Sequence, residues 1–534
     1  MSASELDERI HQRRWWILSV LCLSLVLIVA GNSSLNVALP SIQAALGSSP
    51  SQLQWMVDAY SLVFAVLLLP AGALADRFGR KTALQFGLIV FAAASLAATF
   101  GSQTWHLIAM RALTGLGAAF IMPGTLSLLT NVFRDPRERQ RAIAIWAGCA
   151  GLGGSLGPVI SGVLLEHFAW GSVFFISVVI AAVALLAGAY LLPNSSDPSE
   201  STLDPLGVLL AVGAVGLLLY GIIEAPANGW GSALTVTTIA TGLAVLAGFI
   251  GWELHNPRPM LDIRLFRQRS LSVGASTITL QFFAMYGLYF ALAQYLQISH
   301  GFSALQAGLA GLPIGVFGMI GAPTSATFVR RFGHRRVVGT GLLVSAAGLA
   351  IMGGVTPTTT YALLFVGFCL LGFGNGQTTA PSTTLIMASV PRAKSGVGSA
   401  VNDLSRELGG ALGIAVLGSV MSSVYRDHIG AHAGALAAQA GSTVETTLAE
   451  AQRLAATQPG AAQTLHHAAQ ASFADGFGAA MVVGAIILAG NAVLVWIRGL
   501  HVDPHSDQSA ASPTPPTTVG TDAGTDGPPT AAPS

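Results

Sequence analysis

The sequence predicts an all-α polytopic membrane protein with 14 transmembrane helices. Of its 534 residues, 52% are hydrophobic and only 9% are charged, and the mean hydropathy is +0.64. A soluble domain carries about 25% charged residues. Apolar runs of about 20 residues recur along the chain, and each is long enough to cross a bilayer as a helix. Helices are expected because lipid offers the backbone no hydrogen-bond partners, so the lipid bilayer is an expected partner.

The positions of Lys and Arg orient these helices. With the N-terminus in the cytoplasm, 21 of the 25 Lys and Arg residues fall on the inner side. Only Arg426 and Arg453 fall outside, and Arg111 and Arg406 lie within spans. This positive-inside bias predicts that both termini are cytoplasmic. Two lysines against 23 arginines, with abundant Ala and Gly, indicate a bacterium, so we expect the bacterial cell (inner) membrane. The expected spans are 15–39, 53–75, 83–101, 106–131, 141–166, 171–192, 204–224, 233–254, 271–297, 305–328, 337–355, 360–386, 397–423 and 476–498.

Three stretches lie outside the bundle of spans. Residues 1–14 form a cytoplasmic N-terminus, and 499–534 form a tail rich in Pro, Thr, Ser and Ala that we expect to be disordered. Residues 424–475 form a long extracytoplasmic loop in which short polar helices are expected. The loop places His428 and His432 at i,i+4 spacing, which suits a metal. No convincing third ligand accompanies them, so we expect a solvated helix and no metal.

The sequence also limits the source of energy for any activity. Neither of the two lysines, Lys81 and Lys394, follows a glycine, so the phosphate-binding loop G-x-x-x-x-G-K-[ST] is absent. We therefore expect no ATP and no other cofactor, and the net charge of +1 does not indicate nucleic acid. Without clustered catalytic groups, an enzyme is not expected. Uphill movement of a solute would need an ion gradient, for which an intramembrane carboxylate is the natural coupling device.

A loop after the second span carries a family resemblance. Gly72-Ala-Leu-Ala-Asp-Arg-Phe-Gly-Arg-Lys81 resembles the G-x-L-a-D-R-x-G-R-K loop of the major facilitator superfamily. A degenerate copy, Arg330-Arg-Phe-Gly-His-Arg-Arg336, follows the tenth span, and the two Arg-Phe-Gly triplets start 254 residues apart. That separation is longer than the one expected if two six-helix halves were joined directly. It predicts two six-helix pseudo-repeats with two linker helices between them. The expected parts are an N-terminal bundle at 15–192, linker helices with flanking loops at 193–270 and a C-terminal bundle at 271–498.

Further stretches narrow the resemblance. Arg111-Ala-Leu-Thr-Gly-Leu-Gly-Ala-Ala119 resembles a helix 4 motif of the superfamily. Gly153-Gly-Ser-Leu-Gly-Pro-Val-Ile-Ser-Gly162 resembles the helix 5 motif that marks proton-coupled antiporters. The linker helices resemble those of the 14-spanner drug:proton antiporter family, of the multidrug efflux type, at Asp204-Pro-Leu-Gly207, Gly229-Trp230 and Pro259-Met-Leu-Asp-Ile-Arg-Leu-Phe-Arg267.

The resemblance implies roles for two of these stretches. The first loop is implied to gate the cytoplasmic side by stapling the two halves together, and we expect Gly72 to permit close helix approach. The gating residues are Gly72, Asp76, Arg77, Gly79, Arg80 and Lys81. The helix 5 motif is implied to form a bend that seals against proton leak, although close helix packing alone also explains its glycines. The residues of this antiporter helix are Gly153, Gly157, Pro158 and Gly162.

Asp58 is the first candidate for proton coupling. It lies five residues into its span, a depth of about 7–8 Å, and Arg111 lies at the same depth in the fourth span. Two opposite charges at equal depth invite pairing, because an unpaired charge in the membrane is expensive. In one interpretation Asp58 takes up a proton from outside and releases Arg111. In the other, the pair is static or Asp58 faces an aqueous vestibule. Since Gly31 stands where the family usually has a helix 1 acid, Asp58 is the only carboxylate well inside a span of the N-terminal half.

The thirteenth span holds a second charged cluster. Asp403 and Glu407 share one helix face at i,i+4 spacing, and Arg406 is three residues from Asp403. If Arg406 neutralises Asp403, Glu407 remains as a second proton or cation site. The alternative is an internal ion pair near the cytoplasmic vestibule.

The combined pattern favours a proton-coupled antiporter that exports amphipathic drugs or toxic organic compounds by alternating access. We expect a monomer that exchanges a small-molecule amphipathic substrate for protons and contributes to antibiotic resistance. The alternatives are an exporter of a dedicated native substrate, such as a lipid, siderophore or metabolite, and a non-transporting membrane sensor. Polar groups within spans seek interior partners and are the candidates for the substrate pocket. These candidates are Asn32, Tyr60, Tyr286, Gln294, Asn375 and Gln377.

Overall fold

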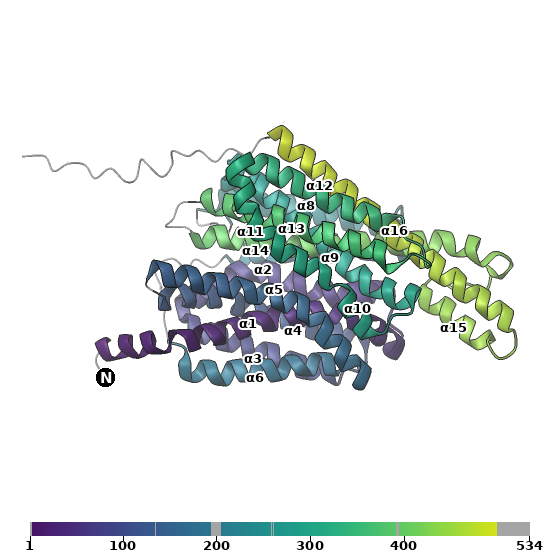
Figure 1. The fold of residues 1–534 in the computed structure, drawn as a ribbon, viewed down its shortest axis with the longest axis horizontal. Helices are drawn as coiled ribbons and strands as arrows, with labels where there is room; N and C mark the ends of the chain where they lie inside the picture. Colours follow the sequence, from purple (N-terminus) through teal and green to yellow (C-terminus); the bar gives the residue numbers. More distant parts are fainter. Residues whose placement is uncertain are drawn as a thin grey trace, which may run out of the picture. The chain divides into compact units, whose positions relative to one another are not determined.

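The computed structural model describes residues 3–133, 135–193, 204–257, 259, 261–390 and 395–498. All the regular structure in these ranges is helical (Figure 1). The helices are α1 Ala3–Leu46, α2 Pro50–Phe78, α3 Arg80–Thr99, α4 Thr104–Val132, α5 Pro136–His167, α6 Ser172–Leu191, α7 Pro205–Asn228, α8 Ala233–His255, η1 Ile263–Arg267, α9 Arg269–His300, α10 Ala304–Ala310, α11 Leu312–Phe332, α12 His334–Gly353, α13 Tyr361–Ala388, α14 Ser395–Ala433, η3 Gly434–Leu436, α15 Val444–Leu454 and α16 Pro459–Arg498. The all-α prediction is confirmed.

Helix packing repeats once along the chain. In the first half, α2 and α3 pack against α4, α1 packs against α5, and α6 contacts both α1 and α3. In the second half, α11 and α12 pack against α13, α9 packs against α14, and α16 contacts both α9 and α12. The same set of neighbours therefore occurs twice, and α10 with α11 takes the place of α2. This repeat confirms the predicted two six-helix pseudo-repeats (Figure 1).

The two copies of the Arg-Phe-Gly loop have the same backbone conformation. Gly79 separates α2 from α3 with φ 109°, and Gly333 separates α11 from α12 with φ 80°. Positive φ is adopted at little cost only by glycine, which explains why both copies keep it. We call residues 76–82, at the turn from α2 to α3, the gate loop.

The linker helices pack against each other and attach to the bundle at the contact between its halves. α7 contacts both α2 of the first half and α14 of the second. Ser419 of α14 donates a hydrogen bond to the Ile222 carbonyl at 2.8 Å, and Trp230 Nε1 donates to Ser423 Oγ at 3.1 Å. The two additional helices therefore brace the junction of the two repeats.

Asp204 explains the linker signature Asp204-Pro-Leu-Gly207. It is only 7% exposed and caps α7, accepting hydrogen bonds from Gly207 N at 2.8 Å, Trp252 Nε1 at 2.8 Å and Asn256 Nδ2 at 2.7 Å. Burial raises the pKa of Asp204, but these donated hydrogen bonds outweigh it and hold the pKa below its ordinary value. The carboxylate thus joins the start of α7 to the end of α8.

We expect Asp204→Asn to lower the melting temperature of the purified protein, by an amount that depends on pH. Hydrogen bonds to a charged group contribute about 1.5–3 kcal/mol each, and the amide replaces one acceptor oxygen with a donor. Because the folded-state pKa is depressed, this stabilisation is present above the ordinary value of 3.8 and is lost as pH falls through the folded-state pKa. The difference between wild type and variant should therefore be larger at about pH 6 than at about pH 3. A difference independent of pH would contradict this account of Asp204.

Two of the predicted spans differ in detail from the helices of the structure. Among the described residues, 13 helices are long and apolar enough to cross a membrane. α5 coincides with the predicted span 141–166 but is not among them, so the count of 14 remains a prediction. The predicted span 305–328 is interrupted at Gly311, between α10 and α11. Pro313, the second residue of α11, lacks the N–H that would continue the helix from α10.

The predicted loop 424–475 is largely helical. α14 continues to Ala433 and α16 begins at Pro459, so the non-helical part is shorter than expected, and η3 and α15 lie between the two helices. The expectation of short polar helices there is confirmed by α15, whose start is fixed by a capping box at Thr443. The N-terminal stretch 1–14 is helical from Ala3 and continuous with the first span. The tail 499–534 lies outside the described residues.

Candidate functional site

Arg111 on α4 is buried and hydrogen-bonded. Its side chain is 2% exposed, Nε donates to the Met56 carbonyl at 3.0 Å, and Nη2 donates to Asn32 Oδ1 at 2.8 Å. The guanidinium also lies 4.5 Å from the centre of the Tyr60 ring, within the range of a cation–π interaction. Arg111 therefore joins α1, α2 and α4 through neutral partners.

The expected pair between Asp58 and Arg111 is not formed. Asp58 is fully buried, and neither of its carboxyl oxygens has a hydrogen-bond partner among the described residues. The pair was expected because the two residues lie at the same depth in their spans. Depth alone does not make two side chains neighbours, because the direction of each side chain around its helix axis decides what it contacts. The Arg111 side chain is directed to Met56 and Asn32, and Asp58 is left in an environment that strongly disfavours a bare charge.

The second charged cluster joins the first through Tyr60. Tyr60 lies within electrostatic range of both Arg111 and Glu407, so residues from both halves meet at this point. Glu407 on α14 is 9% exposed, and its Oε2 has no hydrogen-bond partner among the described residues. Tyr286 on α9 and Ser61 on α2 border the same carboxyl group. The sequence predicted two separate clusters and missed this junction, since nothing in residue spacing links α2 to α14.

Arg406 does not form the direct ion pair that would neutralise Asp403. Its guanidinium lies 4.6 Å from the centre of the Phe282 ring. Asp403 Oδ1 accepts a hydrogen bond from Asn402 Nδ2 at 3.3 Å. Both acids of α14 nevertheless lie within electrostatic range of Arg406. The cation therefore acts on both acids at a distance instead of cancelling one of them.

Close approach of α2 and α4 depends on Gly115. A Cβ atom at Gly115 would lie 2.5 Å from the Tyr60 carbonyl oxygen and 3.2 Å from its Cα. A Cβ atom at Gly72, by contrast, would lie no closer than 3.7 Å to Pro123, which is ordinary van der Waals contact. The expectation that Gly72 permits a close helix approach is therefore wrong. Gly115 has this role, because the backbone beside Asp58 and Tyr60 leaves no room for a methyl group.

We expect Gly115→Ala to lower the melting temperature markedly and Gly72→Ala to leave it nearly unchanged. Overpacking against a backbone atom costs about 1–3 kcal/mol or more, whereas a substitution in open space stays within about 0.5 kcal/mol. Thermal unfolding of the two purified variants, monitored side by side, checks the prediction. Equal melting temperatures for the two variants would show that α2 can move away from α4 at little cost.

The helix 5 motif packs against both halves. A Cβ atom at Gly157 would meet Ser33 Oγ and the Ala30 carbonyl of α1, and one at Gly153 would lie 3.3 Å from Val29 Cβ. On the opposite half, a Cβ atom at Gly162 would lie 2.5 Å from Leu305 Cα of α10.

Pro158 takes part in the same contact. Its carbonyl oxygen lies 2.5 Å from the position of a Cβ atom at Gly308 of α10. Small residues therefore allow α5 and α10 to approach closely. This contact between the halves lies at the end opposite the gate loop.

The gate loop contacts the end of α6. Lys81 Nζ donates to the Ala189 carbonyl near the end of α6 at 2.8 Å. Arg77 is exposed and lies against the ring of its neighbour Phe78, and Arg80 begins α3. The side chain of Asp76 lies outside the described residues. The contacts of Lys81 stay within the first half, so the gating role remains a prediction.

The candidate pocket residues separate into three groups. Asn32, Tyr60 and Tyr286 belong to the junction around Arg111 and Glu407. Gln377 donates to the Gly321 carbonyl and Thr324 of α11, which favours a packing role, and Asn375 accepts from Thr379 on its own helix. Gln294 is the one candidate that lines a cavity between the two halves.

That cavity has a volume of about 210 Å³ and lies at the end opposite the gate loop. Both halves and α7 contribute to its wall, through Gln54, Ile223, Gln294, Tyr425, Arg426 and Phe473. Ligand pockets for drug-sized molecules usually measure about 300–1,000 Å³. The cavity is therefore smaller than such a ligand requires, and separation of the halves would enlarge it.

Gly31, which stands where the family usually has a helix 1 acid, lies on a face of α1 that is directed away from Arg111. A Cβ atom at this position would lie 3.4 Å from the Phe91 ring and 3.5 Å from Ser177 Oγ. An acid here would point toward α3 and α6 and not toward Arg111. The neighbouring Asn32 occupies the face of α1 that reaches Arg111.

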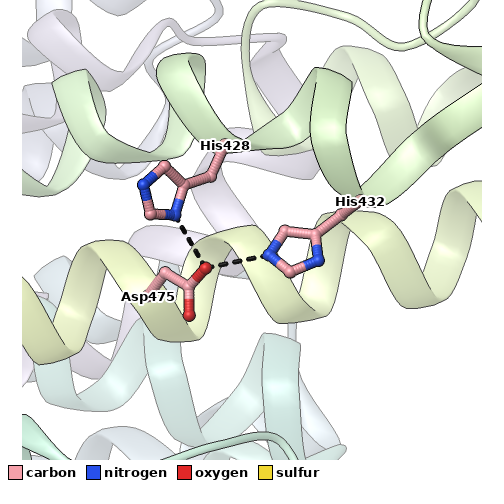
Figure 2. Close-up of side chains that lie close together, drawn as sticks. All are labelled: His428, His432 and Asp475. Carbon is pink, nitrogen blue, oxygen red and sulfur yellow. Dashed lines mark hydrogen bonds and ion pairs between the residues drawn. The ribbon is translucent and has the colours of Figure 1, made fainter.

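The expectation that His428 and His432 lack a third ligand is wrong. Asp475, the last residue of the predicted loop 424–475, lies beside both imidazoles (Figure 2). It is 43 residues from His432 in the sequence, so only the antiparallel packing of α14 and α16 reveals it.

Two six-helix bundles with the same internal packing, which enclose buried acids, have the architecture of a secondary transporter. The sequence profile of the Major Facilitator Superfamily matches residues 21–414. The chain belongs to this family.

Its relatives include drug efflux and resistance proteins. The chain is 36% identical to the multidrug efflux pump LfrA of Mycolicibacterium smegmatis, over 92% of this chain and 97% of that protein. It is 31% identical to the tetracenomycin C resistance and export protein of Streptomyces glaucescens, over 95% and 96%. It is 34% identical to the methyl viologen resistance protein SmvA of Salmonella typhimurium, over 84% and 90%.

A solved structure supports the fold. The bacterial homolog of the human lysosomal transporter Spinster, in an inward-facing and unoccupied conformation, superposes with a TM-score of 0.65 at 18% identity. The match covers 91% of this chain and 96% of that chain.

Proposed function

We propose that the chain is a proton-coupled antiporter that exports amphipathic drugs or toxic organic compounds across the bacterial plasma membrane by alternating access. The observation that carries the proposal is the pair of buried carboxyl groups, Asp58 and Glu407: both oxygens of Asp58 and Oε2 of Glu407 lack hydrogen-bond partners among the described residues. Burying a bare carboxylate costs free energy, whereas the neutral acid is tolerated. Such a group can take up a proton from one side and lose it when water from the other side reaches it.

The junction around Tyr60 supplies the link between protons and substrate. Asn32, Tyr60 and Arg111 come from the first half, and Tyr286 and Glu407 come from the second. A motion that separates the halves changes the surroundings of all five residues at once. Substrate and proton can then compete for the same set of interactions, which is the condition for exchange.

The orientation of the exporter follows from the cationic loops. In this proposal the gate loop and both termini are cytoplasmic, since Lys and Arg gather on that side. The contact of Gly162 and Pro158 with α10 is then the seal on the outer side. The chain acts as a monomer in this proposal, because one chain supplies both halves that form the transport pathway.

Transport by purified protein in liposomes tests the proposal. Methyl viologen is a suitable probe, because resistance to it is named in a relative. An acidic lumen should drive methyl viologen or ethidium into vesicles through inside-out molecules, as protons leave in exchange, and a protonophore should abolish this accumulation. Accumulation that persists without a pH gradient would overturn proton coupling. Proton-coupled movement of an extracted membrane lipid, with no movement of either drug, would instead favour an exporter of a dedicated native substrate.

A further inference from the structure

Three metal-ligating side chains converge outside the proton and substrate machinery. His428 and His432 lie on α14, and Asp475 lies on α16 (Figure 2). One carboxylate oxygen, Asp475 Oδ2, lies 2.8 Å from His428 Nδ1 and 2.9 Å from His432 Nε2. The three donor atoms all lie within 4.8 Å of one another. Two imidazole nitrogens and a carboxylate oxygen thus face one point.

The geometry is close to that of a zinc site. Zinc binds imidazole nitrogen and carboxylate oxygen at about 2.0–2.2 Å, so neighbouring donors in a tetrahedral site lie roughly 3.3 Å apart. The two observed distances to Asp475 Oδ2, 2.8 and 2.9 Å, need to increase by only about 0.5 Å. The two imidazole nitrogens, which lie within 4.8 Å of each other, need to approach by at most about 1.5 Å. Rotation of the three side chains supplies this, since both histidines sit one helical turn apart on the same face of α14.

The cluster is open to ions and water. The side chains of His428, His432 and Asp475 are 52%, 38% and 40% exposed. An ion can therefore enter from the aqueous side, and water can fill the fourth position. Two neutral imidazoles and one carboxylate carry a single negative charge, which complements a divalent cation.

The geometry points to a binding site for a divalent transition-metal ion of the zinc type. His428 Nδ1, His432 Nε2 and Asp475 Oδ2 are its protein ligands, and water completes a tetrahedron. The bound ion joins α14 to α16 across the chain segment that contains α15. Both helices form part of the wall of the 210 Å³ cavity, through Tyr425 and Phe473. The metal therefore fixes the relative position of two helices beside that cavity.

Metal titration of the purified full-length protein, prepared without a polyhistidine tag and stripped with a chelator, tests the site. The wild type should bind one equivalent of Zn²⁺ by calorimetry, and Co²⁺ should give the visible absorption of a tetrahedral nitrogen–oxygen site. Removal of a neighbour that only orients a ligand already weakens metal binding about 10–100-fold. His428→Ala and Asp475→Asn, which remove ligands, should therefore weaken it by at least about 100-fold.

The matched control is the double variant His466→Ala/His467→Ala. These two exposed histidines lie on the same extension of α16, next to each other in the sequence and without a carboxylate partner among the described interactions. The control should keep wild-type affinity, and Zn²⁺ should raise the melting temperature of the wild type and control only. Loss of affinity in the control alone, equal affinity in all variants, or no tetrahedral Co²⁺ absorption would overturn the proposal. Exposed substitutions are expected to fold, and the metal-free melting temperatures verify this.

Discussion

Replacing Asp58 with asparagine is expected to abolish proton-driven export while leaving the protein as stable as the wild type, or more stable. The amide has the shape of the acid but cannot take up and release a proton, so accumulation driven by a pH gradient should fall to the level of protein-free liposomes. Stability should not fall, because the Asp58 oxygens have no hydrogen-bond partner to lose among the described residues. Transport in liposomes and thermal unfolding measure the two effects.

The stability measurement separates this account from a static ion pair with Arg111. Breaking a buried pair would cost about 3–5 kcal/mol, because the arginine would be left uncompensated. A clear fall in the melting temperature of Asp58→Asn would therefore show that the pair exists in the folded protein. Unchanged export with unchanged stability would remove Asp58 from the mechanism.

Replacing Glu407 with glutamine is expected to cause a comparable loss of gradient-driven export. Glu407 is the acid of the second half that reaches the junction with Tyr60, and its Oε2 has no partner among the described residues. The glutamine variant should still bind ethidium, with affinity changed by less than about tenfold. Fluorescence titration measures binding, and the liposome assay measures export.

Glu450→Gln is the matched control for this substitution. Glu450 lies on α15, outside the spanning helices, where it pairs with Arg453 at 3.4 Å. Its replacement should leave both binding and export unchanged. An equal loss of export in the two glutamine variants would show that the effect of Glu407→Gln is not specific to the junction.

Much of the fold could be predicted because its causes are local in the sequence. Apolar runs defined the spanning helices, and the two Arg-Phe-Gly loops revealed the repeat through Gly79 and Gly333. Helix starts were less exact, because the prediction used apolar runs alone: α2 begins at Pro50, after its cap Ser49, and not at the predicted residue 53. The extent of α14 and α16 was underestimated, because the last turns of α14 and the first turns of α16 are too polar to be recognised as spans.

The site was predicted only in part, because side-chain direction depends on packing between distant helices. The burial of Asp58 and Arg111 followed from sequence depth, but the hydrogen bond from Arg111 to Asn32 did not. The approach of Glu407 to Tyr60 depends on how α14 meets α2. Gly115 is a sequence signal only for the close approach of α4 to α2, because a Cβ atom there would meet the Tyr60 backbone.

Proton release from detergent-solubilised protein on addition of ethidium or methyl viologen tests the central claim most directly. The wild type should release protons into a weakly buffered solution as the drug binds, because drug and protons compete at the junction. The double variant Asp58→Asn/Glu407→Gln should bind the drug and release none. Release of the same number of protons by the double variant would contradict the assignment of these two carboxyl groups as the proton carriers.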